Sequence, residues 1–135
     1  MDVFVEGTVP TRGTPGSAGG DLRVSGFHTI QPGAIKMVGT GVKAKIPFGQ
    51  VGLVFARSSL AQKHGLKLVN GVGVIDSDYR GEIQLVLENF EKNVATVCEG
   101  DRLAQIVIMP CYMGDFIEAE LDESDRGGFG STGRD

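Results

Sequence analysis

The sequence predicts an all-β fold, a sandwich, jelly roll or barrel that contains one short helix. Val, Ile and Thr together outnumber Ala and Leu by 30 to 17 in the 135 residues, a balance that favours strands over helices. Glycine contributes 21 residues and separates the apolar stretches at short intervals. The chain is therefore expected to form one domain of short strands joined by tight turns.

Strand-like stretches follow one another along the whole chain, and several alternate apolar and polar residues with the period of a strand. Ile83, Leu85 and Leu87 fall on one face of their stretch, whereas Gln84 and Glu88 fall on the other. The predicted strands are Val3-Glu6, Leu22-Ile30, Ala34-Ile46, Val51-Ala56, Leu66-Val69, Val72-Ile75, Glu82-Leu87, Ala95-Cys98, Leu103-Met109 and Phe116-Leu121.

One segment has a helical signature. Ser59-Leu60-Ala61-Gln62 has the Ser-x-x-Gln form of a capping box, and Gly65 supplies a stop. We expect a helix of one or two turns there.

Composition and charge exclude several classes of protein. A formal charge of −4 and a pI near 5.1 argue against nonspecific nucleic-acid binding, which normally uses a basic face. Cys98 and Cys111 match no metal or redox spacing, so a reducing compartment is expected. The apolar runs are too short to span a bilayer, and no secretory signal begins the chain. These features predict a cytoplasmic protein, with the nucleus as the alternative in a eukaryotic host.

Carboxylates at two turns are the leading candidates for chemistry. Asp76 follows an apolar run and could position and deprotonate a water molecule. Asp21 follows a glycine pair, and hard oxygen ligands of this kind suit Mg²⁺ bound to substrate phosphates. Arg57, just before the predicted helix, could bind an anion. Taken singly, each is also compatible with an ordinary turn or a surface arginine.

Five segments stand out in order and extend over nearly the full length of the chain. They are Ala18-Gly19-Gly20-Asp21-Leu22, Ala56-Arg57-Ser58-Ser59-Leu60-Ala61, the segment from Asn70 to Gly81, Gly100-Asp101-Arg102-Leu103-Ala104-Gln105, and the segment from Arg126 to Gly133. Taken together, they resemble the five motifs of the homotrimeric deoxyuridine triphosphate nucleotidohydrolases (dUTPases).

The resemblance implies a distorted jelly-roll β domain over residues 1–125 and a flexible C-terminal arm over residues 126–135 that closes over the active site. It implies a homotrimer with active sites shared between subunits. It also implies the hydrolysis of dUTP to dUMP and pyrophosphate with Mg²⁺ on the triphosphate, which keeps uracil out of DNA and supplies dUMP for thymidylate synthesis. The partners would be dUTP and further copies of the chain, without direct nucleic-acid binding and without a membrane.

The same resemblance implies roles for single residues. Asp76 would orient and activate the water that attacks the α-phosphorus. Tyr79 would pack on the deoxyribose and exclude a 2′-hydroxyl, and therefore UTP. Asp21 would help to hold Mg²⁺ through its water shell.

The other implied substrate contacts fall into three groups. A hairpin would recognise uracil through Asn70, Gly71, Val72, Gly73 and Val74. Phosphates or ordered water would be contacted by Arg57, Ser58, Ser59 and Gln105. In the arm, Phe129 would stack over uracil, Gly130 would add a contact, and the outer phosphates would be held by Arg126, Ser131 and Thr132.

Two positions depart from the family pattern, and two other interpretations stay open. Ser59 stands where the second motif commonly has Gly, and Arg126-Gly127 joins Gly128-Phe129 directly, which shortens the arm. The related dCTP deaminases share the fold, but their catalytic Glu would fall at Val86. A non-catalytic nucleotide-sensing or capsid-type jelly roll would need neither Asp76 nor the arm.

Overall fold

A computed structural model of the chain describes residues 2–123, which form eleven strands and one short helix. The elements are β1 (Phe4–Gly7), β2 (Gly20–Arg23), β3 (His28–Ile30), β4 (Ile35–Gly39), β5 (Val42–Lys45), β6 (Gln50–Ala56), α1 (Ser58–His64), β7 (Leu66–Leu68), β8 (Gly73–Ile75), β9 (Gln84–Asn89), β10 (Ala95–Val97) and β11 (Arg102–Pro110).

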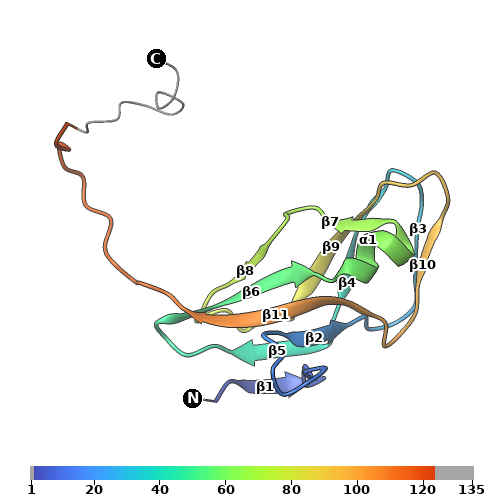
Figure 1. Cartoon of the computed structure of the whole chain (residues 1–135), viewed down its shortest axis with the longest axis horizontal. Coiled ribbons are helices and arrows are strands. Elements are labelled where there is room, and N and C mark those ends of the chain that lie inside the picture. The colour runs from blue at the N-terminus through green and yellow to red at the C-terminus, as the bar shows by residue number, and fades with distance from the viewer. Residues whose placement is uncertain (1, 124–135) are drawn as a thin grey trace.

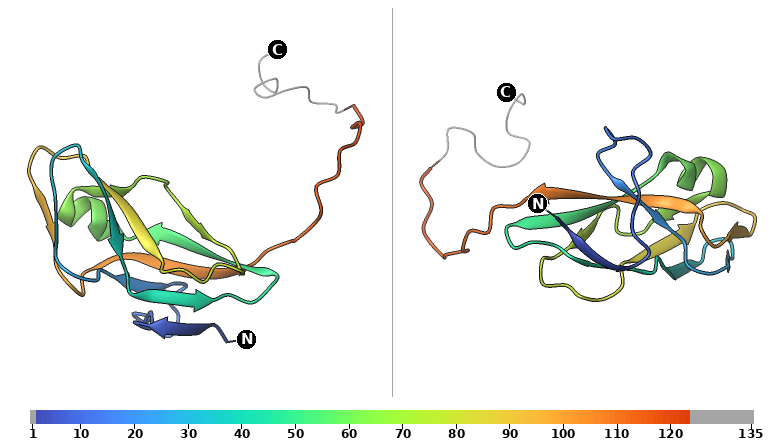
Figure 2. Two further views of the ribbon diagram at one scale, coloured as in Figure 1. Left: turned by 180° about the vertical axis from the view of Figure 1, so that it is seen from behind. Right: turned by 90° about the horizontal axis from the view of Figure 1, so that it is seen from below.

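The strands pair in an antiparallel manner throughout the described residues. The largest sheet has the order β2-β11-β6-β8, and a second has the order β4-β9-β7. Two further pairs, β1 with β5 and β3 with β10, complete the arrangement seen in Figures 1 and 2. The prediction of an all-β fold with one short helix is therefore confirmed.

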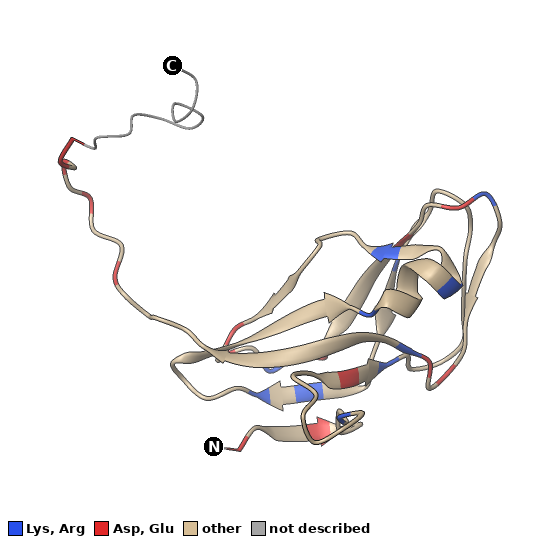
Figure 3. Ribbon diagram, viewed as in Figure 1, with Lys and Arg blue, Asp and Glu red and all other residues tan. Residues whose placement is uncertain are grey.

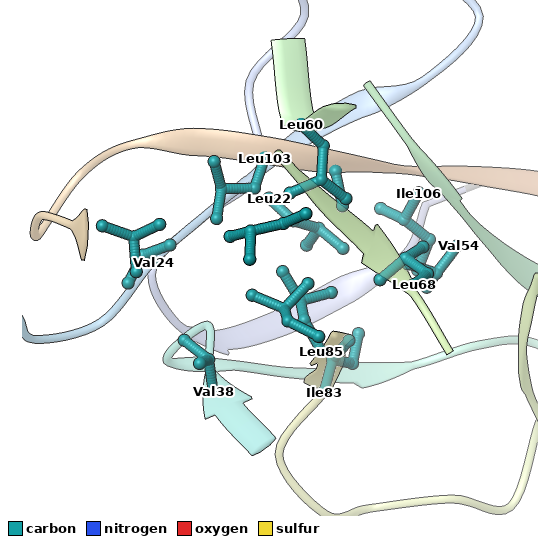
Figure 4. Close-up of a cluster of buried hydrophobic side chains, with 14 of the residues drawn as sticks. Leu22, Val24, Val38, Val54, Leu60, Leu68, Ile83, Leu85, Leu103 and Ile106 are labelled. Atoms are coloured by element: carbon teal, nitrogen blue, oxygen red, sulfur yellow. The ribbon is translucent and has the colours of Figure 1, made fainter. Parts of the chain in front are cut away.

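The core lies between the two larger sheets. Figure 4 shows Leu22 and Leu103 of the four-stranded sheet facing Val38 of β4 and Leu85 of β9, with Leu60 of α1 beside them. Each of these side chains is at most 1% exposed. Full burial of such an aliphatic side chain contributes about 1.5–3 kcal/mol, so this cluster holds the sheets in place.

The predicted alternation around β9 is confirmed, because Ile83, Leu85 and Leu87 are all buried. Two predicted strands, however, are wrong as single strands. Leu22-Ile30 divides into β2 and β3, and Ala34-Ile46 divides into β4 and β5. Gly26 and Gly41 adopt left-handed φ angles of 83° and 69° at these breaks, a conformation that glycine takes at little cost and that ends an extended run.

The helix is also where predicted, but its start differs. Arg57 is the N-cap of α1 and makes no side-chain capping bond, so the predicted capping box at Ser59 is wrong. Ser59 is already inside the first turn, and its hydroxyl donates instead to the carbonyl of Arg102 at 3.4 Å. Gly65 ends the helix with φ 65°, and its N–H donates to the carbonyl of Ala61, as a left-handed C-terminal glycine does.

The predicted strand Phe116-Leu121 is wrong. Residues 111–123 form no strand or helix, and they leave the body of the domain after β11 in both views (Figures 1 and 2). Phe116, Ile117 and Leu121 are at least 81% exposed. A strand needs a neighbour to accept and donate its backbone hydrogen bonds, and this segment points away from the strands of its own chain. Figure 3 shows acidic and no basic residues along it.

The described residues contain no helix long and apolar enough to cross a membrane.

Candidate active site

The predicted site residues within the described chain lie in two regions. The first is a polar hollow at the Ala56 end of β6. It has a volume of about 290 Å³ and combines a loop, β2, the start of α1 and β11. The residues that line this polar hollow are Gly13, Ser17, Gly19, Asp21, Arg57, Ser58, Arg102 and Gln105.

Asp21 organises the charges of the polar hollow. The residue is only 8% exposed, and its two carboxylate oxygens accept from different arginines. Oδ1 accepts from Nη1 of Arg57, and Oδ2 accepts from Nη1 of Arg102 at 3.5 Å. A buried carboxylate is costly unless it is paired, so this side chain fixes both guanidinium groups. Each guanidinium has five N–H donors and keeps others for a bound anion.

Gln105 lies across the backbone of Gly19. A Cβ atom at Gly19 would come within 2.7 Å of Oε1 of Gln105, so only glycine leaves room for this side chain. The pairing of β11 with β2 places Gln105 opposite Asp21. Ser59, predicted to share this site, is not among the residues that line the polar hollow, and it contacts the Arg102 carbonyl instead.

The second region comprises residues 70–82 and is called the 70–82 segment. It begins with a tight turn before β8. Gly71 has φ 70°, its N–H donates to the Leu68 carbonyl at 3.1 Å, and the N–H of Val72 donates to the Asn70 carbonyl at 2.7 Å. Asn70, Gly73 and Val74 line a small hollow of about 110 Å³. Two side-chain amides, those of Asn70 and Gln84, therefore border this space together with aliphatic side chains.

Asp76 and Tyr79 line a neighbouring hollow of about 260 Å³ together with Val74, Glu82 and Val86. The N–H of Tyr79 donates to the Asp76 carbonyl at 3.1 Å and closes a turn between them. Both side chains are exposed. Val86 faces this hollow, so the position at which a deaminase would need its glutamate carries an aliphatic side chain.

The two regions follow a definite order along β6. Val54 pairs with Gly73 and Gly52 pairs with Ile75, so Asp76 lies beyond Gly52, away from Ala56. Arg57 is five residues further along β6 than Gly52, a separation of about 17 Å at the rise of an extended strand. The turn at Asn70 precedes Gly73 and therefore lies nearer the Ala56 end of β6 than Asp76 does.

No group of three or more His, Cys, Asp or Glu able to hold a metal ion occurs within residues 2–123. The carboxylate predicted to assist Mg²⁺, Asp21, has both oxygens directed at arginines. This geometry is compatible with contact to a cation through water.

Sequence reasoning assigned no role to four residues of the polar hollow, namely Gly13, Ser17, Gly19 and Arg102. Arg102 stands inside the fourth motif, three residues before Gln105, so its charge was a usable signal. Gly13 and Ser17 lie in an ordinary loop with no such signal. Five predicted contacts lie outside the described residues: Arg126, Phe129, Gly130, Ser131 and Thr132.

Comparison with known proteins shows which family this chain resembles. The family model described as dUTPase matches residues 5–133. A deoxyuridine 5'-triphosphate nucleotidohydrolase of Desulfitobacterium hafniense (strain DSM 10664 / DCB-2) is 51% identical over 131 residues, which cover 93% of this chain and 87% of the relative. The dUTPase of Streptococcus mutans is 37% identical with a TM-score of 0.79, and the match covers 83% of this chain and 98% of that chain.

A more distant structure extends the likeness in fold. A mutant dUTPase from phage phi11 of S. aureus is 23% identical with a TM-score of 0.81, over 90% of this chain and 98% of that chain. That structure is described as revealing the coordination of a structural Mg(II) ion.

The chain therefore belongs to the dUTPase family and is a dUTP diphosphatase, an enzyme that hydrolyses dUTP to dUMP. The predicted family and the jelly-roll fold are confirmed.

Proposed function

We propose that this chain hydrolyses dUTP in an active site composed of two copies, with the polar hollow of one copy facing the 70–82 segment of another. The order of the two regions along β6 carries this proposal. A nucleotide extends from base to sugar to phosphates. With uracil at Asn70 and the α-phosphate at Asp76, the outer phosphates point away from Arg57 of the same chain. The phosphate contacts must then come from a second copy.

Arg57, Ser58 and Gln105 of the polar hollow contact the phosphates or ordered water, with Asp21 holding Arg57 in place. Donors fixed before the substrate arrives stabilise the negative charge that develops during phosphoryl transfer. Arg102 adds a second positive charge, because its guanidinium donates to the other carboxylate oxygen of Asp21. Ser59 acts through its contact with the Arg102 carbonyl.

The 70–82 segment binds the nucleoside. The side chain of Asn70 and the backbone of Gly71, Val72, Gly73 and Val74 recognise the edge of uracil, and Tyr79 packs on the deoxyribose. The hollow beside Asn70 supports this role, because it combines aliphatic side chains with polar groups that can fix the orientation of a base.

Asp76 is the general base. It accepts a proton from a water molecule whose oxygen attacks the α-phosphorus, while the bond from that phosphorus to the bridging oxygen of pyrophosphate breaks. The products are dUMP and pyrophosphate. The exposure of Asp76 in a single copy supports a site that closes only against a second subunit and the C-terminal arm.

Mg²⁺ is the proposed cofactor, held mainly by substrate phosphates as this cation usually is. It would supply neutralisation of the triphosphate charge and polarisation of the phosphoryl oxygens. Asp21 reaches it through water, because both of its oxygens face arginines.

The proposed assembly is a homotrimer in which each chain comprises a β domain, residues 1–125, and an arm, residues 126–135, that covers the site. Residues 111–123 support an assembly, since exposed apolar side chains such as Phe116 and Leu121 need a surface to cover them. The open edge of β1, whose described partner is β5, offers a second copy such a place.

The proposed role in the cell is to remove dUTP from the cytoplasm, which keeps uracil out of DNA and provides dUMP for thymidylate synthesis. Val86 in the hollow beside Asp76 disfavours deamination of dCTP.

The test is pyrophosphate release from dUTP, with dCTP, dTTP and UTP as controls, with and without Mg²⁺, on material whose mass is measured by light scattering. We expect turnover of dUTP alone, dependence on Mg²⁺ and three copies per particle. Ammonia release from dCTP, or a fully active monomer, would contradict the proposal.

A further inference from the structure

The ring of Tyr79 lies directly over Gly81. A Cβ atom at Gly81 would come within 2.5 Å of the tyrosine Oη, 2.7 Å of Cζ and 3.0 Å of Cε1. The backbone of Gly81 is not in the left-handed region, so this glycine is needed for space rather than for conformation. Any side chain at this position would push the ring away.

The tip of the same ring is held as well. Oη of Tyr79 donates to the backbone carbonyl of Glu82 at 2.8 Å. A half-exposed tyrosine normally samples several staggered rotamers. Here the ring rests on Gly81 along its edge and is bonded at its tip, although 42% of the residue is exposed.

Glu82, whose carbonyl accepts this bond, is itself attached to the core through the turn between β4 and β5. The carboxylate of Glu82 accepts from the Gly41 N–H at 2.8 Å. The next residue, Ile83, is 1% exposed, donates its N–H to the Val42 carbonyl at 2.8 Å and accepts from the Thr40 hydroxyl at 2.6 Å. Glu82 therefore cannot shift without disturbing buried hydrogen bonds, which are costly to break.

We infer that Gly81 and Glu82 are positioning residues that hold the Tyr79 ring in one place and thereby set the discrimination between dUTP and UTP. The inference rests on the proposed contact of Tyr79 with the deoxyribose. A ring held in one place excludes a 2′-hydroxyl, whereas a ring free to change its rotamer makes room for it. Steric selectivity against UTP therefore depends on Gly81 and Glu82 as well as on Tyr79.

The test is a double-mutant cycle on G81A and Y79A, with kcat/KM measured for dUTP and for UTP. The matched control is G16A, because a Cβ at Gly16 meets nothing closer than Thr14 Oγ1 at 3.9 Å. G81A should lower the preference for dUTP over UTP about tenfold or more, within the range that a methyl-sized change in a pocket produces. In the Y79A background the same change should lower it no further.

A second variant removes the hydroxyl without creating a clash. Y79F keeps the ring and loses the bond to Glu82, so the preference for dUTP should fall about two- to tenfold, the range expected for one hydrogen bond. This variant tests the inference even if G81A fails to fold, which the thermal unfolding midpoint of each variant will show.

The outcomes separate the inference from the proposed function. Unchanged selectivity in both G81A and Y79F, or an equal loss from G81A with and without the Tyr79 ring, overturns the inference. A wild-type enzyme without preference for dUTP, or a Y79A enzyme with unchanged preference, instead overturns the proposed role of Tyr79.

Discussion

The polar hollow and the 70–82 segment hold their functional groups in opposite ways. The polar hollow draws Asp21, Arg57 and Gln105 from separate strands and the helix start, and charge pairing fixes Asp21 and Arg57. The 70–82 segment is one continuous stretch whose turns are closed by its own backbone, as at Tyr79 and Asp76. Charged donors for phosphates thus depend on the fold, whereas groups for the nucleoside depend on local turns. The order of these regions along β6 is the reason for the proposal that two copies share one site.

The strongest test of this contrast is D76A, which removes the proposed base from the 70–82 segment and leaves the polar hollow intact. We expect kcat to fall by roughly 10²–10⁴, the usual contribution of general-base catalysis. Binding of a non-hydrolysable dUTP analogue, measured by calorimetry, should persist because the phosphate contacts are elsewhere. Near-normal turnover would refute the role of Asp76.

The proposal that two copies share a site is tested by mixing subunits that carry R57A with subunits that carry D76A. Each parent is expected to be nearly inactive. Every trimer that contains both variants places one intact Arg57 hollow against one intact Asp76, so the mixed trimers should recover about a third of the wild-type activity per chain. Co-expression with two different tags and activity assays on doubly purified material provide the measurement. Activity no higher than the parents would show that each chain forms its own site.

The next test separates Asp21 as an anchor for arginines from Asp21 as a partner of the metal. D21N removes the charge that pairs with Arg57 and Arg102 and should lower kcat/KM about tenfold to a hundredfold through misplaced donors. The Mg²⁺ concentration at half-maximal rate should change little, because Asp21 is proposed to reach the ion only through water. A matched acid-to-amide control is E88Q, whose partner Lys67 lies 3.6 Å away in a partly exposed pair of little energetic weight. A clear rise in the Mg²⁺ requirement of D21N would favour direct ligation of the metal by Asp21.

The smallest effect concerns the two serines at the start of α1. Ser58 lines the polar hollow, whereas Ser59 contacts the Arg102 carbonyl at 3.4 Å. S59A should therefore change kcat/KM by less than about twofold, and S58A by about two- to tenfold, the range of one lost hydrogen bond. Equal losses in steady-state assays on dUTP would show that the two serines share one role.

Much of this protein was predictable because the signals are local. The strand around Leu85 followed from its alternation, and Gly65 ended the helix because glycine takes a left-handed conformation readily. The motifs containing Asp21, Arg57 and Asp76 identified the family, since their residue types and order survive in the one-dimensional chain.

The errors arose where a neighbour in space decides the outcome. Phe116-Leu121 has the composition of a strand, but no strand of its own chain lies beside it. Ser59 has the spacing of a capping residue, but Arg57 occupies the N-cap. Arg102 was overlooked because only the pairing of β11 with β2 brings it to Asp21.

By itself, the sequence determined the class of fold and the enzyme family, because these depend on short-range patterns. The tertiary structure alone decided that Asp21 holds two arginines and that the polar hollow and Asp76 stand apart along β6. Pairing of strands distant in sequence sets those distances, and no local propensity encodes a distance between residues that meet only in the folded sheet.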